Sequence, residues 1–153
     1  RKYAEALDLT VLDQNGKSQV VTMGSYGIGV SRAVAAIAEQ THDEIGLNWP
    51  REIAPADIHI VATGKEAEVF KAALTLAEDL EEKGVRVMFD DRPDASAGVK
   101  FKDAELIGIP FIVIVGKALA EGKVEFRVRR TGEKTEIELL KAVTEITSRV
   151  LNS

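Results

Sequence analysis

The sequence of 153 residues contains no cysteine and only two histidines, His42 and His59. The absence of cysteine excludes disulfides, thiolate metal sites and a cysteine nucleophile. The two histidines are too few and too far apart in sequence to indicate a metal site. We therefore expect no metal ligands in this chain.

Long apolar runs are also missing. No stretch reaches the roughly 18 apolar residues that cross a bilayer, and the first residues lack the apolar core of a signal peptide. We therefore expect a cytoplasmic protein with no membrane partner. The net charge of −5 gives no overall basic field, so a nucleic acid would have to bind through local patches.

The composition is that of a globular protein, with 45% hydrophobic and 29% charged residues. The length suits one ordinary domain, or one small domain with a piece of another. The chain begins with Arg1 rather than Met. We therefore expect part of a longer protein.

The first fifty residues predict a β-hairpin followed by a helix. Residues 6–13 alternate as a strand, Asn15 and Gly16 favour a tight turn, and residues 19–23 return as the partner strand. Residues 30–40 show the spacing of an amphipathic helix. An isolated hairpin and helix bury little apolar surface, which indicates that they pack on a larger sheet elsewhere.

Residues 41–55 contain two prolines and a glycine and show no periodicity. We interpret this segment as a connector between domains, held to a neighbour by Trp49 and Ile53. The chain then divides into residues 1–50, a linker at 51–56, and a second domain at 57–153.

The second domain predicts an α/β fold. Its expected elements, in order, are a strand at 58–62, a helix at 66–83 with Val69, Ala73, Leu76 and Leu80 inward, a strand at 85–90, a short helix at 99–108, strands at 111–115 and 123–130, a return strand at 135–138, and a last helix with Leu140, Val143, Ile146 and Val150 inward. This order favours a mixed sheet, parallel at its centre, antiparallel at one edge and flanked by helices.

Glycines 24, 27 and 29 lie between a predicted strand and a predicted helix, and Arg32 falls in the first helical turn. Glycine lets the backbone approach a base or a phosphate, and arginine offers a planar cationic fork. Three interpretations are open: a tight turn that serves packing, a dinucleotide-binding fingerprint, or an adenine and triphosphate contact in a ligase-type active site. Ser31 and Arg32 disfavour the second, because that turn needs a small residue for close helix packing.

The segment Met23-Gly24-Ser25-Tyr26-Gly27-Ile28-Gly29-Val30-Ser31-Arg32, with the alanine-rich helix after it, resembles the third signature motif of class II aminoacyl-tRNA synthetases, in the form found in bacterial prolyl-tRNA synthetases. The resemblance continues through His42-Asp43-Glu44, Trp49-Pro50, Ile53-Ala54-Pro55, Asp90-Asp91-Arg92, Gly98 to Pro110, and Val115-Gly116-Lys117. It covers essentially the whole chain. It implies that residues 1–50 end a class II catalytic domain and that residues 57–153 are an anticodon-binding domain.

The resemblance implies a parent enzyme that joins proline to ATP, with Mg²⁺, and passes the prolyl group to its tRNA. By motif match, Arg32 is the catalytic residue that holds the terminal phosphates, and Gly27 and Gly29 line the adenine site. Ser25 and Tyr26 lie near the amino-acid pocket; many bacterial relatives have cysteine at the position of Ser25. A homodimer is implied for the parent. Since the other two catalytic motifs are missing here, we expect this chain alone to be inactive and to hold no cofactor.

An anticodon offers unstacked bases to a protein, and proline anticodons end in two guanines. Guanine presents O6 and N7 to a cation, and N1–H and N2–H to a carboxylate. The charged groups that match this chemistry are Asp90, Asp91, Arg92, Lys100 and Lys102, which we predict to contact the anticodon. The alternative interpretation is that they are ordinary solvated loop charges.

Nearby residues carry less specific signals. Phe101 is expected in the core rather than stacked on a base, and Glu105 is a weaker candidate carboxylate. Arg127, Arg129 and Arg130 are expected on the outward face of a strand, where they either protect a sheet edge or contact tRNA phosphates.

Two rival functions differ in class. A stand-alone anticodon-like RNA-binding module without catalysis would need the second domain but not an intact Gly-x-Gly-x-x-Arg pattern ending at Arg32. A dinucleotide-binding enzyme would need an acidic residue at the end of a following strand, which this sequence lacks.

Overall fold

The computed structural model describes residues 1–152. It forms two compact units, Arg1–Ala33 and a larger unit that begins at Val34. In chain order the elements are α1 (Lys2–Ala6), β1 (Thr10–Leu12), β2 (Ser18–Val20), α2 (Val30–Thr41), β3 (Ile58–Ala62), α3 (Ala67–Glu82), β4 (Val87–Asp90), α4 (Ala97–Ile107), β5 (Phe111–Val115), the 3₁₀ helix η1 (Lys117–Glu121), β6 (Lys123–Val128), β7 (Lys134–Glu138) and α5 (Leu139–Leu151).

The first unit contains the predicted hairpin, with β1 and β2 antiparallel. Its turn forms as expected, because Asp13 Oδ1 accepts hydrogen bonds from the amides of Asn15 and Lys17, each at 2.9 Å, and Gly16 takes φ +74°. The strands are shorter than the predicted 6–13 and 19–23. Helix α1 ends at Ala6, and Asp8 adopts a left-handed φ of 54°, which interrupts an extended strand.

Helix α2 occupies nearly the predicted residues 30–40, but none of its residues is buried. Residues 21–29, between β2 and α2, form neither helix nor strand. The predicted strand-to-helix turn is therefore an irregular nine-residue segment in this structure.

The larger unit has a five-stranded sheet in the order β4-β3-β5-β6-β7. Strand β3 pairs in parallel with β4 and β5, while β5–β6 and β6–β7 are antiparallel. Strands β3 and β5 are buried along their whole length, as apolar strands at the centre of a covered parallel sheet should be. The predicted α/β class with a mixed, centrally parallel sheet is confirmed.

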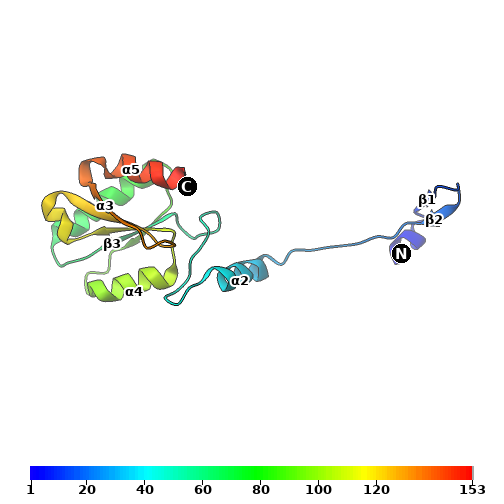
Figure 1. Ribbon diagram of the computed structural model, residues 1–153, viewed down its shortest axis with the longest axis horizontal. Helices are drawn as coiled ribbons and strands as arrows, with labels where there is room; N and C mark the ends of the chain where they lie inside the picture. The colour runs from blue at the N-terminus through cyan, green and yellow to red at the C-terminus, as the bar shows by residue number, and fades with distance from the viewer. Residues whose placement is uncertain (153) are drawn as a thin grey trace. The chain divides into compact units, whose positions relative to one another are not determined.

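Helices cover both faces of this sheet (Figure 1). On one face, α3 and α5 pack on the core that includes Ile58, Ile60 and Val113; on the other, α4 packs through Ala104 on Val61 and Ile112. The inward residues predicted for α3 are all buried. The prediction for α5 was wrong at one position, since Leu140 is 99% exposed.

The phase of α5 explains this error. The helix begins at Leu139, directly after β7, and the residues that face the sheet are Ala142, Ile146 and Val150. Leu139 packs against the core, and Leu140 lies about 100° around the helix from it. Leu140 therefore points to solvent. Its neighbours in the predicted stripe, Val143 and Ile146, do contact the core.

The first half of the connector is held against the rest of the larger unit. The Arg129 guanidinium is buried and donates to both carboxylate oxygens of Asp43, at 2.7 and 2.8 Å, and to the Glu105 carbonyl at 3.0 Å. The prediction that Arg129 faces outward was therefore wrong. Its strand ends at Val128, so the alternation that placed it outside does not continue.

The same segment follows the end of α4. The amides of Leu47 and Trp49 donate to the carbonyls of Leu106 and Gly108, at 3.0 and 3.1 Å. Gly108 has φ +74°, and a Cβ at this position would collide with the Leu47 carbonyl. Glycine is required here both for the end of the helix and for the approach of the connector.

The second half of the connector is held by one buried carboxylate. Asp57 accepts from Arg51 Nε at 2.9 Å and from Arg86 Nη2 at 2.8 Å, and Arg86 also donates to the carbonyls of Ala54 and Arg51. Burial opposes ionisation of Asp57, but the bonds from Arg86 and Arg51 outweigh it and lower its pKa to about 2. Ile53, expected to anchor the segment, is exposed.

Candidate nucleic-acid interface

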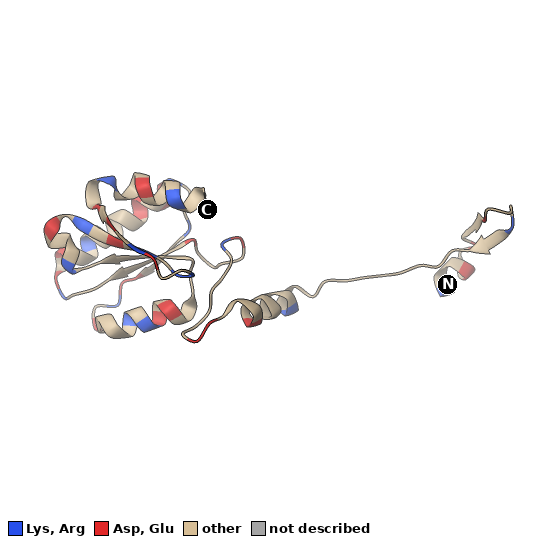
Figure 2. Ribbon diagram, in the orientation of Figure 1, with Lys and Arg blue, Asp and Glu red and all other residues tan. Residues whose placement is uncertain are grey.

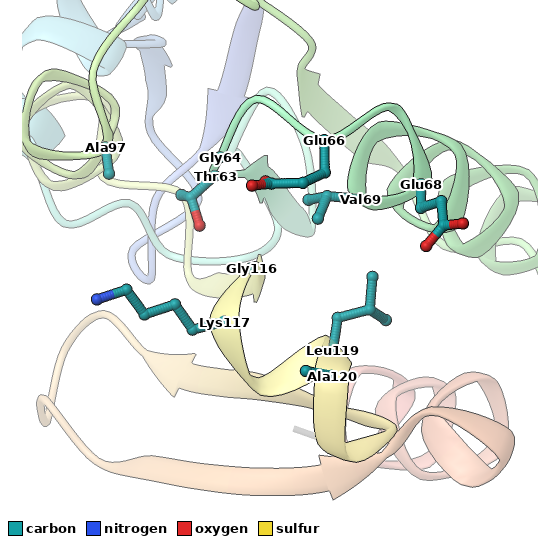
Figure 3. A pocket seen from close by; sticks show the side chains of 10 residues that line it. All are labelled: Thr63, Gly64, Glu66, Glu68, Val69, Ala97, Gly116, Lys117, Leu119 and Ala120. Atoms are coloured by element: carbon teal, nitrogen blue, oxygen red, sulfur yellow. The ribbon is translucent and has the colours of Figure 1, made fainter.

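The carboxyl ends of the parallel strands β3, β4 and β5 meet at one edge of the sheet, the usual place for a ligand in an open α/β sheet. Two adjoining hollows lie there, of about 530 and 560 Å³. Gly64, from the loop after β3, and Ala97, at the start of α4, border both. Figure 3 shows that Lys117 and Leu119 of η1 close the first hollow opposite Thr63 and Glu66.

Lys100 lies beneath this edge rather than on it. Its side chain is 1% exposed, and its Nζ donates to the carbonyls of Ala62 at 2.8 Å and Asp90 at 3.2 Å. The Asp90 carboxylate is 3.5 Å from the same nitrogen, and the Phe70 ring centroid is 5.1 Å away. The ammonium therefore ties the last residues of β3 and β4 together, and it is not placed to touch a base directly.

Asp90 connects this buried cation to the surface. Its carboxylate accepts from Arg92 Nε at 2.9 Å and from Arg92 Nη2 at 2.7 Å. These bonds, together with the nearby Lys100 charge, lower the pKa of Asp90 to about 2, although burial acts the other way. A second carboxylate, Asp103 of α4, accepts from Arg92 Nη2 at 2.7 Å. Both carboxylates raise the pKa of Arg92 above its usual value.

Arg92 is half exposed despite these bonds. Asp91, directly after β4, and Lys102, within α4, are both exposed. Figure 2 shows both signs of charge along α4. The structure thus brings Asp90, Arg92, Lys100 and Asp103 into one network, which we call the Arg92 cluster. Asp91 and Lys102 lie outside this network and are exposed.

Phe101 is partly buried against the cluster of Val61, Ala104, Ile112 and Ile114, as expected for a core residue. The Arg127 guanidinium lies over its ring, 5.2 Å from the centroid, and pairs with Glu125. Arg130 is exposed. Of the three arginines considered as a basic strand face, Arg130 and in part Arg127 reach solvent.

The sequence did not single out Asp103 or give His59 a role. Asp103 lies one helical turn after Lys100, a spacing that could have indicated a shared face. His59 is buried in β3, and its Nδ1 has no hydrogen-bond partner among the described residues. Burial lowers its pKa, with Asp90 and Asp103 acting in the opposite direction.

The residues expected to contact ATP and proline lie in the smaller unit. Tyr26 is 96% exposed, and Ser25 and Arg32 are exposed as well. Gly27 and Gly29 do not take positive φ, and a Cβ at Gly27 would meet nothing within 4 Å. The backbone of this segment therefore forms no closed cradle for a nucleotide.

Within residues 1–152, no group of three or more histidine, aspartate or glutamate side chains is placed to hold a metal ion.

A family model described as "anticodon binding domain" matches residues 57–149, which include the sheet and the Arg92 cluster. The chain belongs to the anticodon-binding domain family. The matched range covers all five strands of the larger sheet and the helices α3 and α4.

Curated relatives of this anticodon-binding domain chain extend the similarity beyond the matched range. A proline–tRNA ligase of Nocardioides sp. is 66% identical over 90% of the chain and 23% of the relative. A proline–tRNA ligase of Kineococcus radiotolerans is 58% identical over 98% of the chain and 26% of the relative. The chain thus spans about a quarter of the length of the curated relatives that it matches.

Among solved structures, a prolyl-tRNA synthetase from Cryptosporidium parvum in complex with L-proline and AMP matches with a TM-score of 0.73. The sequences are 22% identical, and the match covers 98% of this chain and 32% of the other. At this identity the likeness shows a shared fold. No helix among residues 1–152 combines the length and apolar character needed to cross a membrane.

Proposed function

We propose that this chain is part of an ATP-dependent proline–tRNA ligase and that its larger unit recognises the guanines of the proline anticodon. The observation that carries the proposal is the Arg92 cluster. A half-exposed guanidinium is fixed by two carboxylates at the carboxyl edge of the sheet, within the range matched by an anticodon-binding family. Prearranged donors of this kind suit the edge of an unstacked base.

Roles within the cluster follow from exposure. Arg92 and Lys102 are the cations that reach solvent and offer donors to guanine O6 or N7, and Asp91 is the exposed carboxylate for N1–H and N2–H. Lys100 and Asp90 are buried and hold Arg92 in position. This assignment gives Arg92, Lys102 and Asp91 a direct role, and Lys100 and Asp90 an indirect one.

For the smaller unit, we propose the roles that the motif implies: Arg32 at the terminal phosphates of ATP, Gly27 and Gly29 at adenine, and Ser25 and Tyr26 near proline. Their exposure supports a site that other parts of a longer enzyme complete. Proline, ATP with Mg²⁺ and the proline tRNA would be that enzyme's ligands, and a cytoplasmic homodimer its form.

The stand-alone RNA-binding module is the less favoured alternative. Similarity to proline–tRNA ligases extends over 98% of the chain and thus includes the segment with Arg32, which such a module does not need. The chain by itself should show no proline-dependent exchange of pyrophosphate into ATP. Measurable exchange would contradict the assignment of catalysis to a larger assembly.

The anticodon assignment is tested by RNA binding. The probes are a labelled stem-loop with the proline anticodon and the same stem-loop with its two guanines replaced by adenines. We expect Arg92→Ala to weaken binding of the guanine stem-loop by about 1–3 kcal/mol, the value of a good base contact. Lys71→Ala is the matched control, because Lys71 is an exposed cation on α3, across the sheet.

Equal affinity of the unaltered chain for the two stem-loops would overturn the proposed function. An Arg92→Ala effect no larger than that of Lys71→Ala would show that Arg92 is not the reader. Lys102→Ala should give an intermediate loss, since a flexible ammonium is a less specific partner than a fixed guanidinium.

A further inference from the structure

Three of the five N–H donors of Arg92 are used within the protein. Nε and one hydrogen of Nη2 form a side-on pair with the two oxygens of Asp90, at 2.9 and 2.7 Å. The remaining hydrogen of Nη2 goes to Asp103 Oδ2 at 2.7 Å. Among the described residues, none accepts a hydrogen bond from Nη1, so this nitrogen is the part of Arg92 offered to a ligand.

The bond to Asp103 changes what Arg92 can recognise. The end of a guanidinium clamps a phosphate through one hydrogen from each terminal nitrogen, whereas Nη1 alone can still donate to a single acceptor on a base, such as guanine O6 or N7. Asp103 already occupies the hydrogen that Nη2 would contribute. A ligand that needs both terminal nitrogens must first displace Asp103, whose side chain is 37% exposed.

The charge of the cluster acts in the same direction. Three cations, Lys100, Arg92 and the exposed Lys102, are set against three carboxylates, Asp90, Asp103 and the exposed Asp91. Carboxylates repel a nearby phosphate, because both are negatively charged. A phosphate approaching Arg92 therefore meets a surface without excess positive charge, whereas the neutral edge of a base meets both donors and acceptors.

We propose that Asp103 is a specificity-determining residue: it competes for Arg92 and thereby restricts the Arg92 cluster to base edges at the expense of backbone phosphates. The proposal rests on the proposed function, since it assumes that the cluster binds RNA. Asp103 acts through Arg92 and does not itself touch the ligand. Its effect is to lower affinity for RNA in general while preserving the preference for guanine.

The test compares Asp103→Ala and Asp103→Asn with the unaltered chain. Alanine frees the Nη2 hydrogen and removes the charge, whereas asparagine removes the charge but keeps an acceptor oxygen. Asp79→Ala is the matched control, because Asp79 is an exposed helical aspartate on α3, across the sheet from α4. The RNAs are the guanine stem-loop, the adenine stem-loop and poly(U), each titrated at several salt concentrations.

We expect Asp103→Ala to bind poly(U) more tightly and to reduce the preference for guanine over adenine. Freed for a phosphate, Arg92 should steepen the dependence of log Kobs on log salt by about 0.7, the value for one added contact on a single strand. Asp103→Asn should show a smaller change in the same direction, and Asp79→Ala should change neither the slope nor the preference.

Unchanged salt dependence and guanine preference in Asp103→Ala would overturn the proposal, provided that the unaltered chain prefers the guanine stem-loop. If the unaltered chain shows no such preference, the proposed function itself fails. Thermal unfolding reports whether each variant is folded. If Asp103→Ala does not fold, Asp103→Asn decides the question, and an unchanged slope in that variant would overturn the proposal.

Discussion

Replacing Lys100 with methionine removes the buried ammonium and keeps most of the apolar stem. Three oxygen contacts are lost, to the carbonyls of Ala62 and Asp90 and to the Asp90 carboxylate. Loss of one partner from a buried ion pair costs about 3–5 kcal/mol. Because Arg92 still neutralises Asp90, we expect the lower end, a loss of about 3 kcal/mol in the free energy of unfolding.

Urea denaturation followed by the fluorescence of Trp49, the single tryptophan, measures this loss in the larger unit. With a typical slope of about 1–3 kcal/mol per molar urea, Lys100→Met should lower the midpoint by at least about 1 M without changing the slope. Lys102→Met is the control, because it makes the same change two residues away at an exposed position. An exposed substitution of this kind should stay within about 0.5 kcal/mol.

Similar midpoints for the two variants would refute the view that the Lys100 ammonium joins the ends of β3 and β4. A large change of slope without a change of midpoint would also contradict it, because it would indicate an altered denatured state rather than a lost contact. Lys100→Arg should recover little stability, since a planar guanidinium does not fit a site built around one nitrogen.

Three further predictions concern charge and burial. The pKa of Asp57 is lowered to about 2, so the stability it contributes is present above about pH 4 and lost as the pH falls toward 2; Asp57→Asn should flatten this acid limb in urea titrations. Burial lowers the pKa of His59, so the unfolded chain binds its proton first and stability should fall from pH 7 to 5; a His59→Leu variant that keeps this slope would contradict the assignment. Arg129→Met should speed hydrogen exchange of the Trp49 amide about tenfold or more, since hydrogen bonds to charged groups contribute about 1.5–3 kcal/mol, whereas Arg130→Met should leave it unchanged.

Much of the larger unit could be predicted from local patterns. The apolar run Phe111–Val115 and the periodicity of α3 depend on residues that contact the core directly, so their sequence carries their burial. Gly84 and Gly108 take positive φ after helices, which marks helix ends in the sequence as well. These signals were sufficient for the order of elements and the fold class.

The errors concern residues whose environment is set by distant parts of the chain. Lys100 looks like a surface cation in sequence, and only the ends of β3 and β4 turn it into an interior one. Arg129 is buried because Asp43, far away in sequence, reaches it. Asp103, for which the sequence suggested no role, reaches Arg92 from α4. No periodicity in the sequence encodes such partners, because they arise from tertiary packing.

The position of Arg129 has a practical consequence for shorter versions of this protein. A polypeptide that began at Asp57, where the family match begins, would lack Asp43 and leave the Arg129 guanidinium in the interior without its carboxylate. It would also lose the hydrogen bond from Arg51 to Asp57. The hydrogen bonds from the Leu47 and Trp49 amides to the carbonyls at the end of α4 would be lost as well. The smallest soluble and well-ordered RNA-binding reagent should therefore start ahead of Asp43. Yield and spectral dispersion should drop sharply once that residue is cut away.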